Sequence, residues 1–131
     1  MSKRRILYYW SLAAGVLGTI VGILHTAFTP NVHAGYSTVA PERALGVAYF
    51  FGAMGLYVIL TGLLTIYTAF GLRDGEPWAW RVALGTAVTN TVNGIGAVAV
   101  GFRHPPALIW LVASGSLCAA LLLLRAGEQR P

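Results

Sequence analysis

The segment TAVTNTVNG (residues 86–94) is the most polar part of a long apolar run that extends from residue 78 to residue 101. It places two carboxamides and three hydroxyls among aliphatic side chains. In a membrane these groups have to hydrogen-bond to neighbouring helices, because lipid offers no partners. The polar residues of the run share one helical face, at i, i+4, i+7 and i+11. That face consists of Thr86, Asn90, Asn93 and Ala97, and the opposite face of Val88, Val92 and Ile95. We therefore expect the first face to point into a bundle of helices, and Asn93 to be buried and hydrogen-bonded across helices.

The rest of the chain has the same apolar character, with a mean hydropathy of +0.68 and only 10% charged residues in a chain of 131. Four segments are each long enough to cross ~30 Å of hydrocarbon at ~1.5 Å per residue. They cover about residues 6–28, 43–72, 78–101 and 107–124. The prediction is an all-α integral membrane protein, in which residues 1–131 form a single domain and four spans pack as a four-helix bundle.

The net charge of +5 does not indicate nucleic acid binding, because the basic residues cluster at the ends of the apolar segments. Seven of them lie on the side of the two termini and the second loop, whereas Arg43 and Arg103 lie on the other side. The seven are Lys3, Arg4, Arg5, Arg73, Arg81, Arg125 and Arg130. By the positive-inside rule we expect both termini in the cytoplasm and a multi-pass protein of the cell (inner) membrane. The first apolar run resembles a secretory signal, but it is longer than a usual signal core and favours a membrane helix.

Small residues form a stripe on each of the first two spans. The stripes contain Gly15, Gly18 and Gly22 in the first span and Ala48, Gly52, Gly55 and Gly62 in the second. Because small residues let membrane helices approach closely, we expect the two stripes to face each other. Pro30 is expected to end the first helix, and residues 31–41 to form an outer loop that lies on the bundle. A tight turn is predicted at residues 73–77 and an outer turn at residues 102–106.

Four polar or aromatic side chains are expected on inward faces at a similar depth, in the outer half of the membrane. They are His25, Tyr49, Asn90 and Asn93, and Trp110 near the outer end of the fourth span is a fifth candidate for ligand binding. An imidazole at this depth could hydrogen-bond the head of a quinone, ligate a metal or haem, or move protons. Equally, His25 could hold two helices together. Interhelical hydrogen bonding is the commoner use of the two asparagines, and apolar packing that of Tyr49 and Trp110.

Glu42 is the only carboxylate outside the predicted cytoplasmic turn and tail, so Glu42 and His25 are the candidates for acid–base catalysis. A salt bridge from Glu42 to Arg43 or Arg103 at a helix start is the favoured alternative. The chain has no Walker A motif, no dinucleotide fingerprint and no second inward histidine for a bis-histidine haem. Cys118 has no partner for an intramolecular disulfide. We predict no metal site and assign no cofactor.

The motif GILHTAFTP (residues 22–30), followed by RALG (residues 43–46) and the glycine-spaced second span, resembles the DoxX-like group of small four-helix membrane proteins. The resemblance covers roughly the first three helices. It implies a membrane subunit or partner of an oxidoreductase system, often one linked to quinones.

Three functional interpretations are open at this point. The first is a polar pocket in the outer half of the membrane that binds a lipophilic molecule, such as a quinone or an isoprenoid. The second is a membrane enzyme that isomerises or cyclises a lipid-like substrate by acid–base chemistry. The third is a structural subunit whose glycine-rich faces bind another membrane protein or a second copy of the chain. All three have the lipid bilayer as a partner and none involves nucleic acid.

Overall fold

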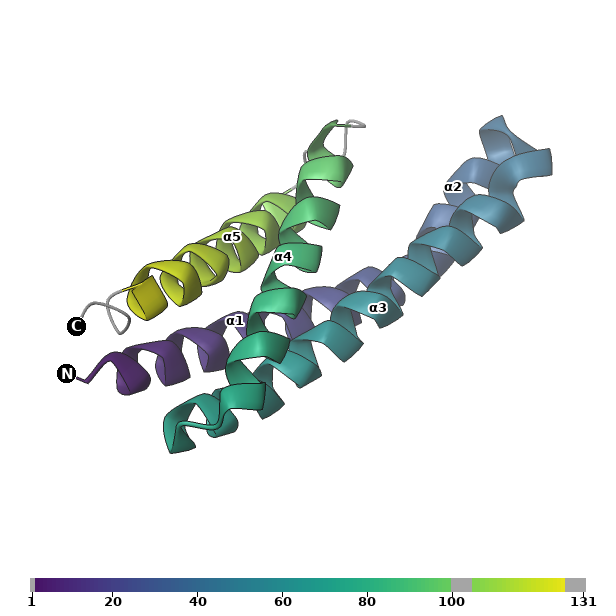
Figure 1. The fold of residues 1–131 in the computed structure, drawn as a ribbon. Coiled ribbons are helices and arrows are strands. Elements are labelled where there is room, and N and C mark those ends of the chain that lie inside the picture. The colour runs from purple at the N-terminus through teal and green to yellow at the C-terminus, as the bar shows by residue number, and fades with distance from the viewer. Residues whose placement is uncertain (1, 100–104, 127–131) are drawn as a thin grey trace.

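The fold is described from a computed structural model, for residues 2–99 and 105–126, and contains five α-helices in these ranges (Figure 1). They are α1 (Lys3–Ala27), α2 (Thr29–Val39), α3 (Pro41–Asp74), α4 (Pro77–Ala99) and α5 (Pro105–Ala126). By length and composition, four helices, all except α2, are suited to crossing a membrane. The predicted all-α bundle with four membrane spans is confirmed, and the protein is a small polytopic membrane protein.

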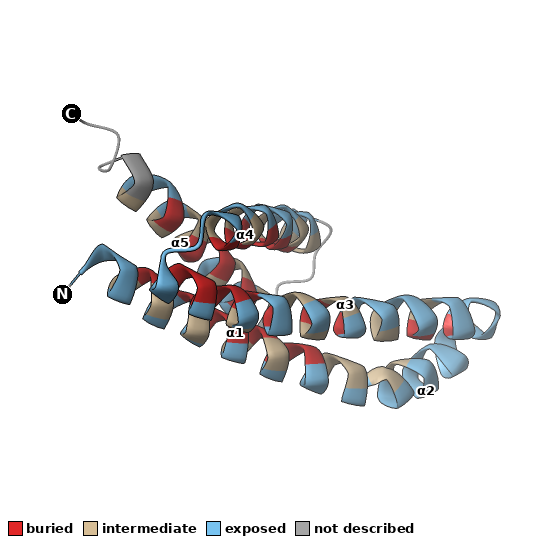
Figure 2. Cartoon of the chain, turned by 60° about the horizontal axis from the view of Figure 1, so that its bottom comes forward, coloured by how far each residue is buried: buried red, intermediate tan, exposed pale blue. Residues whose placement is uncertain are grey.

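The helix α2 occupies the segment that was expected to be a loop, so the loop prediction for residues 31–41 is wrong. Pro30 lies in the first turn of α2, where its missing N–H breaks no helical hydrogen bond. Phe28 keeps helical backbone angles between α1 and α2, with φ −81° and ψ −6°. α1 ends at Ala27, just before this proline, as the sequence predicts, and the proline then starts a second helix in place of the expected loop. No residue of α2 is buried, and the helix lies beside the first part of α3 (Figure 2).

The two glycine stripes pack against each other, as the sequence predicts. A Cβ atom added to Gly15 would lie 2.8 Å from the carbonyl oxygen of Gly62. A Cβ atom added to Gly22 would lie 2.8 Å from the carbonyl oxygen of Gly55. At these two positions the backbones of α1 and α3 approach too closely for any other residue. The resulting antiparallel pair of α1 and α3 has the most extensive contact between two helices of the bundle.

The core divides into two apolar clusters. The larger cluster consists of Leu7, Ala14, Leu72, Ala79, Ala83, Ala87, Leu117 and Leu121. Three of its alanines, Ala79, Ala83 and Ala87, lie along one face of α4, where small side chains allow close helix packing. The smaller cluster consists of Val21, Val58 and Trp110, with Tyr57 partly buried against it. The indole of Trp110 lies directly over Gly18, where any side chain would collide with it. Gly18, which was expected on the stripe that faces α3, therefore has its closest contact with α5.

The turn between α3 and α4 depends on Gly75, which has a φ of 81°. Only glycine adopts this left-handed conformation without strain. Around it, the N–H of Glu76 donates to the carbonyl of Gly71 at 2.8 Å, and Pro77 begins α4. The tight turn predicted at residues 73–77 is confirmed. Arg103 and His104 of the predicted outer turn lie outside the described residues, as does Arg130.

Candidate functional site

The polar face of α4 points into the bundle, as the segment at residues 86–94 predicts. Thr86 and Asn90 are buried, and Asn90 is only 2% exposed. Asn93 is half-buried. The aliphatic residues of the opposite face, Val88, Val92 and Ile95, are all exposed. The orientation of α4 is therefore the one that keeps its two carboxamides away from lipid.

Both carboxamides lie beside one phenol on α3. The hydroxyl of Tyr57 donates to Oδ1 of Asn90 at 3.0 Å, and the side chain of Asn93 lies close enough to the same phenol to interact with it. A phenolic oxygen can donate one hydrogen bond and accept another, so it can serve both amides at once. Asn93 was predicted to be buried and hydrogen-bonded across helices, but the residue that meets both conditions is Asn90, and Asn93 is half-buried beside it. We call Tyr57, Asn90 and Asn93 the amide–phenol network.

Tyr57 is the member of this network that the sequence interpretation missed. It begins a polar stripe on α3 that continues through Thr61, Thr65 and Thr68. The three threonine hydroxyls donate to carbonyls of their own helix, at 3.2, 2.7 and 2.9 Å. A tyrosine hydroxyl is too far from its own backbone for such a bond and needs a partner on another helix. That difference is the signal that could have identified Tyr57.

Trp110 lies next to the network through Tyr57. The indole is 7% exposed and packs with Val21 and Val58, and Tyr57 is partly buried against this cluster. The structure therefore brings three of the five predicted ligand-binding residues, Asn90, Asn93 and Trp110, around one tyrosine.

His25 lies in a different part of the bundle. Its ring is half-buried and stacks on Phe51, with ring centroids 3.7 Å apart and an interplanar angle of 15°. Phe51 precedes Tyr57 by six residues on α3, which corresponds to ~9 Å along the helix axis. His25 and the amide–phenol network are therefore two separate groups: His25 lies between α1 and α3, near α2, and the network lies between α3 and α4.

Tyr49 and Glu42 do not join the network. Tyr49 is 75% exposed, so the expectation that it faces the interior is wrong. The neighbouring Ala48 is buried, and one residue along a helix turns the side chain by ~100°. Glu42 forms a salt bridge with Arg43 at 3.7 Å, and both side chains are largely exposed. This is the helix-start pairing that the sequence favoured.

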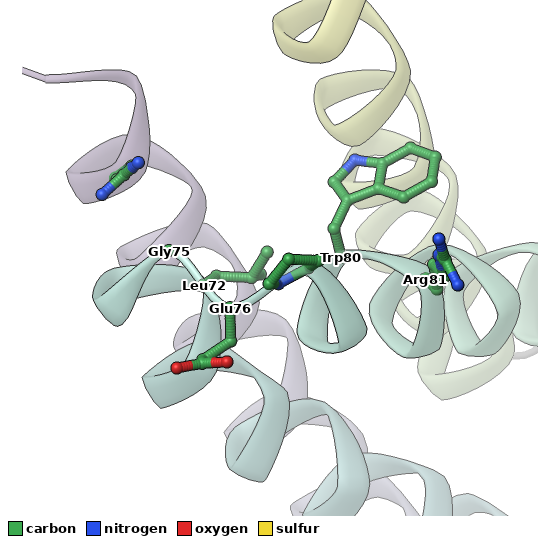
Figure 3. Close-up of a pocket in the computed structure, with 7 residues that line it drawn as sticks. Leu72, Gly75, Glu76, Trp80 and Arg81 are labelled. Atoms are coloured by element: carbon green, nitrogen blue, oxygen red, sulfur yellow. The ribbon is translucent and has the colours of Figure 1, made fainter.

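Two hollows in the bundle lie away from the network. One, of about 270 Å³, is at the turn between α3 and α4 and includes Trp80 and Arg81 in its lining (Figure 3). The other, of about 420 Å³, is apolar and is lined by Leu17 of α1 and by Leu108, Ile109, Val112 and Ala113 of α5. Within residues 2–99 and 105–126 no three histidine, cysteine or acidic side chains are grouped closely enough to hold a metal ion.

A comparison with protein families, with curated proteins and with solved structures finds no match to this chain. The fold and the site therefore define a class only: a small polytopic membrane protein with a polar network between two of its spans.

Proposed function

We propose that the protein binds a lipophilic molecule with a carbonyl or hydroxyl head group, such as a quinone or an isoprenoid alcohol, at the amide–phenol network. The observation that carries this proposal is the position of Asn93, which is half-buried at the edge of the network. A carboxamide has two N–H donors and one carbonyl acceptor. Its interaction with Tyr57 uses at most part of this capacity, and the remainder is available to the head group of a molecule dissolved in the bilayer.

The depth of the network supports a ligand that arrives through the membrane. Asn90 is the fourteenth residue of α4, so it lies ~20 Å along the helix from Pro77, beyond the middle of the hydrocarbon. With both termini in the cytoplasm, as the basic residues favour, this is the outer half of an inner membrane. The resemblance to the DoxX-like group supports a quinone as the ligand and a role as a membrane subunit of an oxidoreductase system.

The two alternative functions, a membrane enzyme and a structural subunit, have less support. For the enzyme, the exposed salt bridge of Glu42 and the stacking of His25 on Phe51 provide no acid or base beside the network. For the structural subunit, Gly15 and Gly22 already pack on α3 and Gly18 lies beneath Trp110. A partner would have to use other faces of the bundle.

Ligand binding is tested on the full chain in lipid nanodiscs, with decyl-ubiquinone and geranylgeraniol as probes and tryptophan fluorescence as the signal. We expect saturable binding of one probe, lost in Asn93→Leu, because leucine is branched at the same atom as asparagine but has no hydrogen-bonding group. Thr89→Val is the matched control, since Thr89 is exposed on the same helix and bonds to its own backbone carbonyl at Gly85. Equal binding by both variants, or no binding by the unmodified chain, would refute the proposal.

A further inference from the structure

The hollow at the turn between α3 and α4 is a second candidate site, independent of the network (Figure 3). Its lining comes from the start of α1, the end of α3 and the start of α4, and consists of Arg4, Leu72, Gly75, Glu76, Pro77, Trp80 and Arg81. We propose that this hollow binds a phosphate group, and specifically the phosphate of an anionic phospholipid.

Two arginines from different helices supply the positive charge. In the part of the chain that the structure describes, the salt bridges are Arg43 with Glu42 and Arg73 with Asp74. The guanidinium groups of Arg4 and Arg81 are therefore not neutralised by a carboxylate within this part. A guanidinium presents several N–H donors in a planar fork that matches phosphate oxygens.

The guanidinium of Arg4 lies against the turn that forms the hollow. A Cβ atom added to Gly75 would lie 2.6 Å from a terminal nitrogen of Arg4, so this guanidinium rests against the glycine of the turn. One carboxylate, that of Glu76, also lies in the lining, and it points away from Trp80 and Arg81 (Figure 3). Two arginines and one glutamate leave the lining with a charge of +1.

The depth of the hollow favours a lipid over a free anion. It lies where α3 ends and α4 begins, which is the level of lipid phosphates for helices that span the hydrocarbon. Trp80 is half-buried there, and its indole N–H donates to the carbonyl of Leu121 at 3.4 Å. Tryptophan at this level is typical of the membrane interface. Basic pockets between membrane helices are known to bind anionic lipid head groups.

The experiment uses the full chain in a non-ionic detergent and measures lipid binding by native mass spectrometry. Phosphatidylglycerol, which is anionic, is titrated in parallel with phosphatidylcholine, which is zwitterionic. We expect tighter binding of phosphatidylglycerol, weakened about fivefold by Arg4→Gln and by Arg81→Gln. Arg5→Gln is the matched control, because it removes the same charge from the same helix but lies outside the lining.

The following results would contradict the proposal. If Arg5→Gln weakens lipid binding as much as Arg4→Gln, binding depends on the overall positive charge of this end of the protein and not on the hollow. If inorganic phosphate at millimolar concentration displaces the lipid completely, the site takes free phosphate. Equal binding of the two lipids would exclude recognition of the anionic head group.

A further variant separates charge from shape. Arg81→Lys keeps the charge but not the planar fork, so it should retain more binding than Arg81→Gln. Equal loss of binding in the two variants would contradict the proposal.

Discussion

Tyr57 is the residue on which the polar interior of the bundle depends. Its hydroxyl serves a carboxamide that is 2% exposed and another that is half-buried. Tyr57→Phe should therefore lower the unfolding free energy by about 1 kcal/mol, the usual range for interhelical hydrogen bonds in membrane proteins. The measurement is unfolding in mixed micelles, followed by circular dichroism.

Tyr49→Phe is the control for this prediction, because it removes the same hydroxyl from an exposed side chain of the same helix. We expect it to leave the unfolding free energy unchanged. Equal losses in the two variants would show that the hydrogen bonds of Tyr57 contribute nothing specific.

Gly18 is a second residue whose role is decided by a single contact. Gly18→Ala places a methyl group against the indole of Trp110, and overpacking of this kind costs about 1–3 kcal/mol. Gly85→Ala is the control, because a Cβ atom at Gly85 meets nothing within 4 Å. We expect only the first variant to melt at a lower temperature.

A double variant tests the mechanism of this destabilisation. If the collision with the indole is the cause, Gly18→Ala combined with Trp110→Leu should cost less than the sum of the two single changes. If the losses of stability of the two single variants simply add, the collision with the indole is not the cause of the destabilisation.

Among the helices, α2 differs from the others in having no buried residue. Helices with few buried contacts open more readily than the core of a protein. In hydrogen exchange followed by mass spectrometry, residues 29–39 should therefore exchange much faster than residues 15–22 of α1, which pack on α3. Equal protection of the two segments would mean that lipid or a partner covers α2.

At the scale of the whole molecule, the excess of basic residues predicts which side of the membrane each end faces. In a Cys118→Ser background, Ser2→Cys lies at the start of α1 and Thr38→Cys lies at the end of α2, and both positions are exposed. A membrane-impermeant maleimide applied to intact spheroplasts should label Thr38→Cys and leave Ser2→Cys unlabelled until lysis. The reverse labelling pattern would show that the protein has the opposite orientation in the membrane.

The helices and the orientation of α4 follow from local features of the sequence. Long apolar runs in a membrane have no stable alternative to helix, because every backbone polar group must be satisfied internally. The period of the polar residues at 86–94 is also sufficient to orient α4, since carboxamides facing lipid would be left without partners. Close packing of Gly15 and Gly22 on α3 follows from composition in the same way.

The choice of partners depends on the tertiary structure instead. The sequence offers Asn90 and Asn93 several hydrogen-bonding groups at a similar depth, and the register and crossing of α3 and α4 select Tyr57. The same geometry turns Tyr49 outwards and covers Gly18 with an indole from α5. A periodic pattern specifies which face of a helix is buried, but not which neighbour covers it, because that depends on how all the helices pack together.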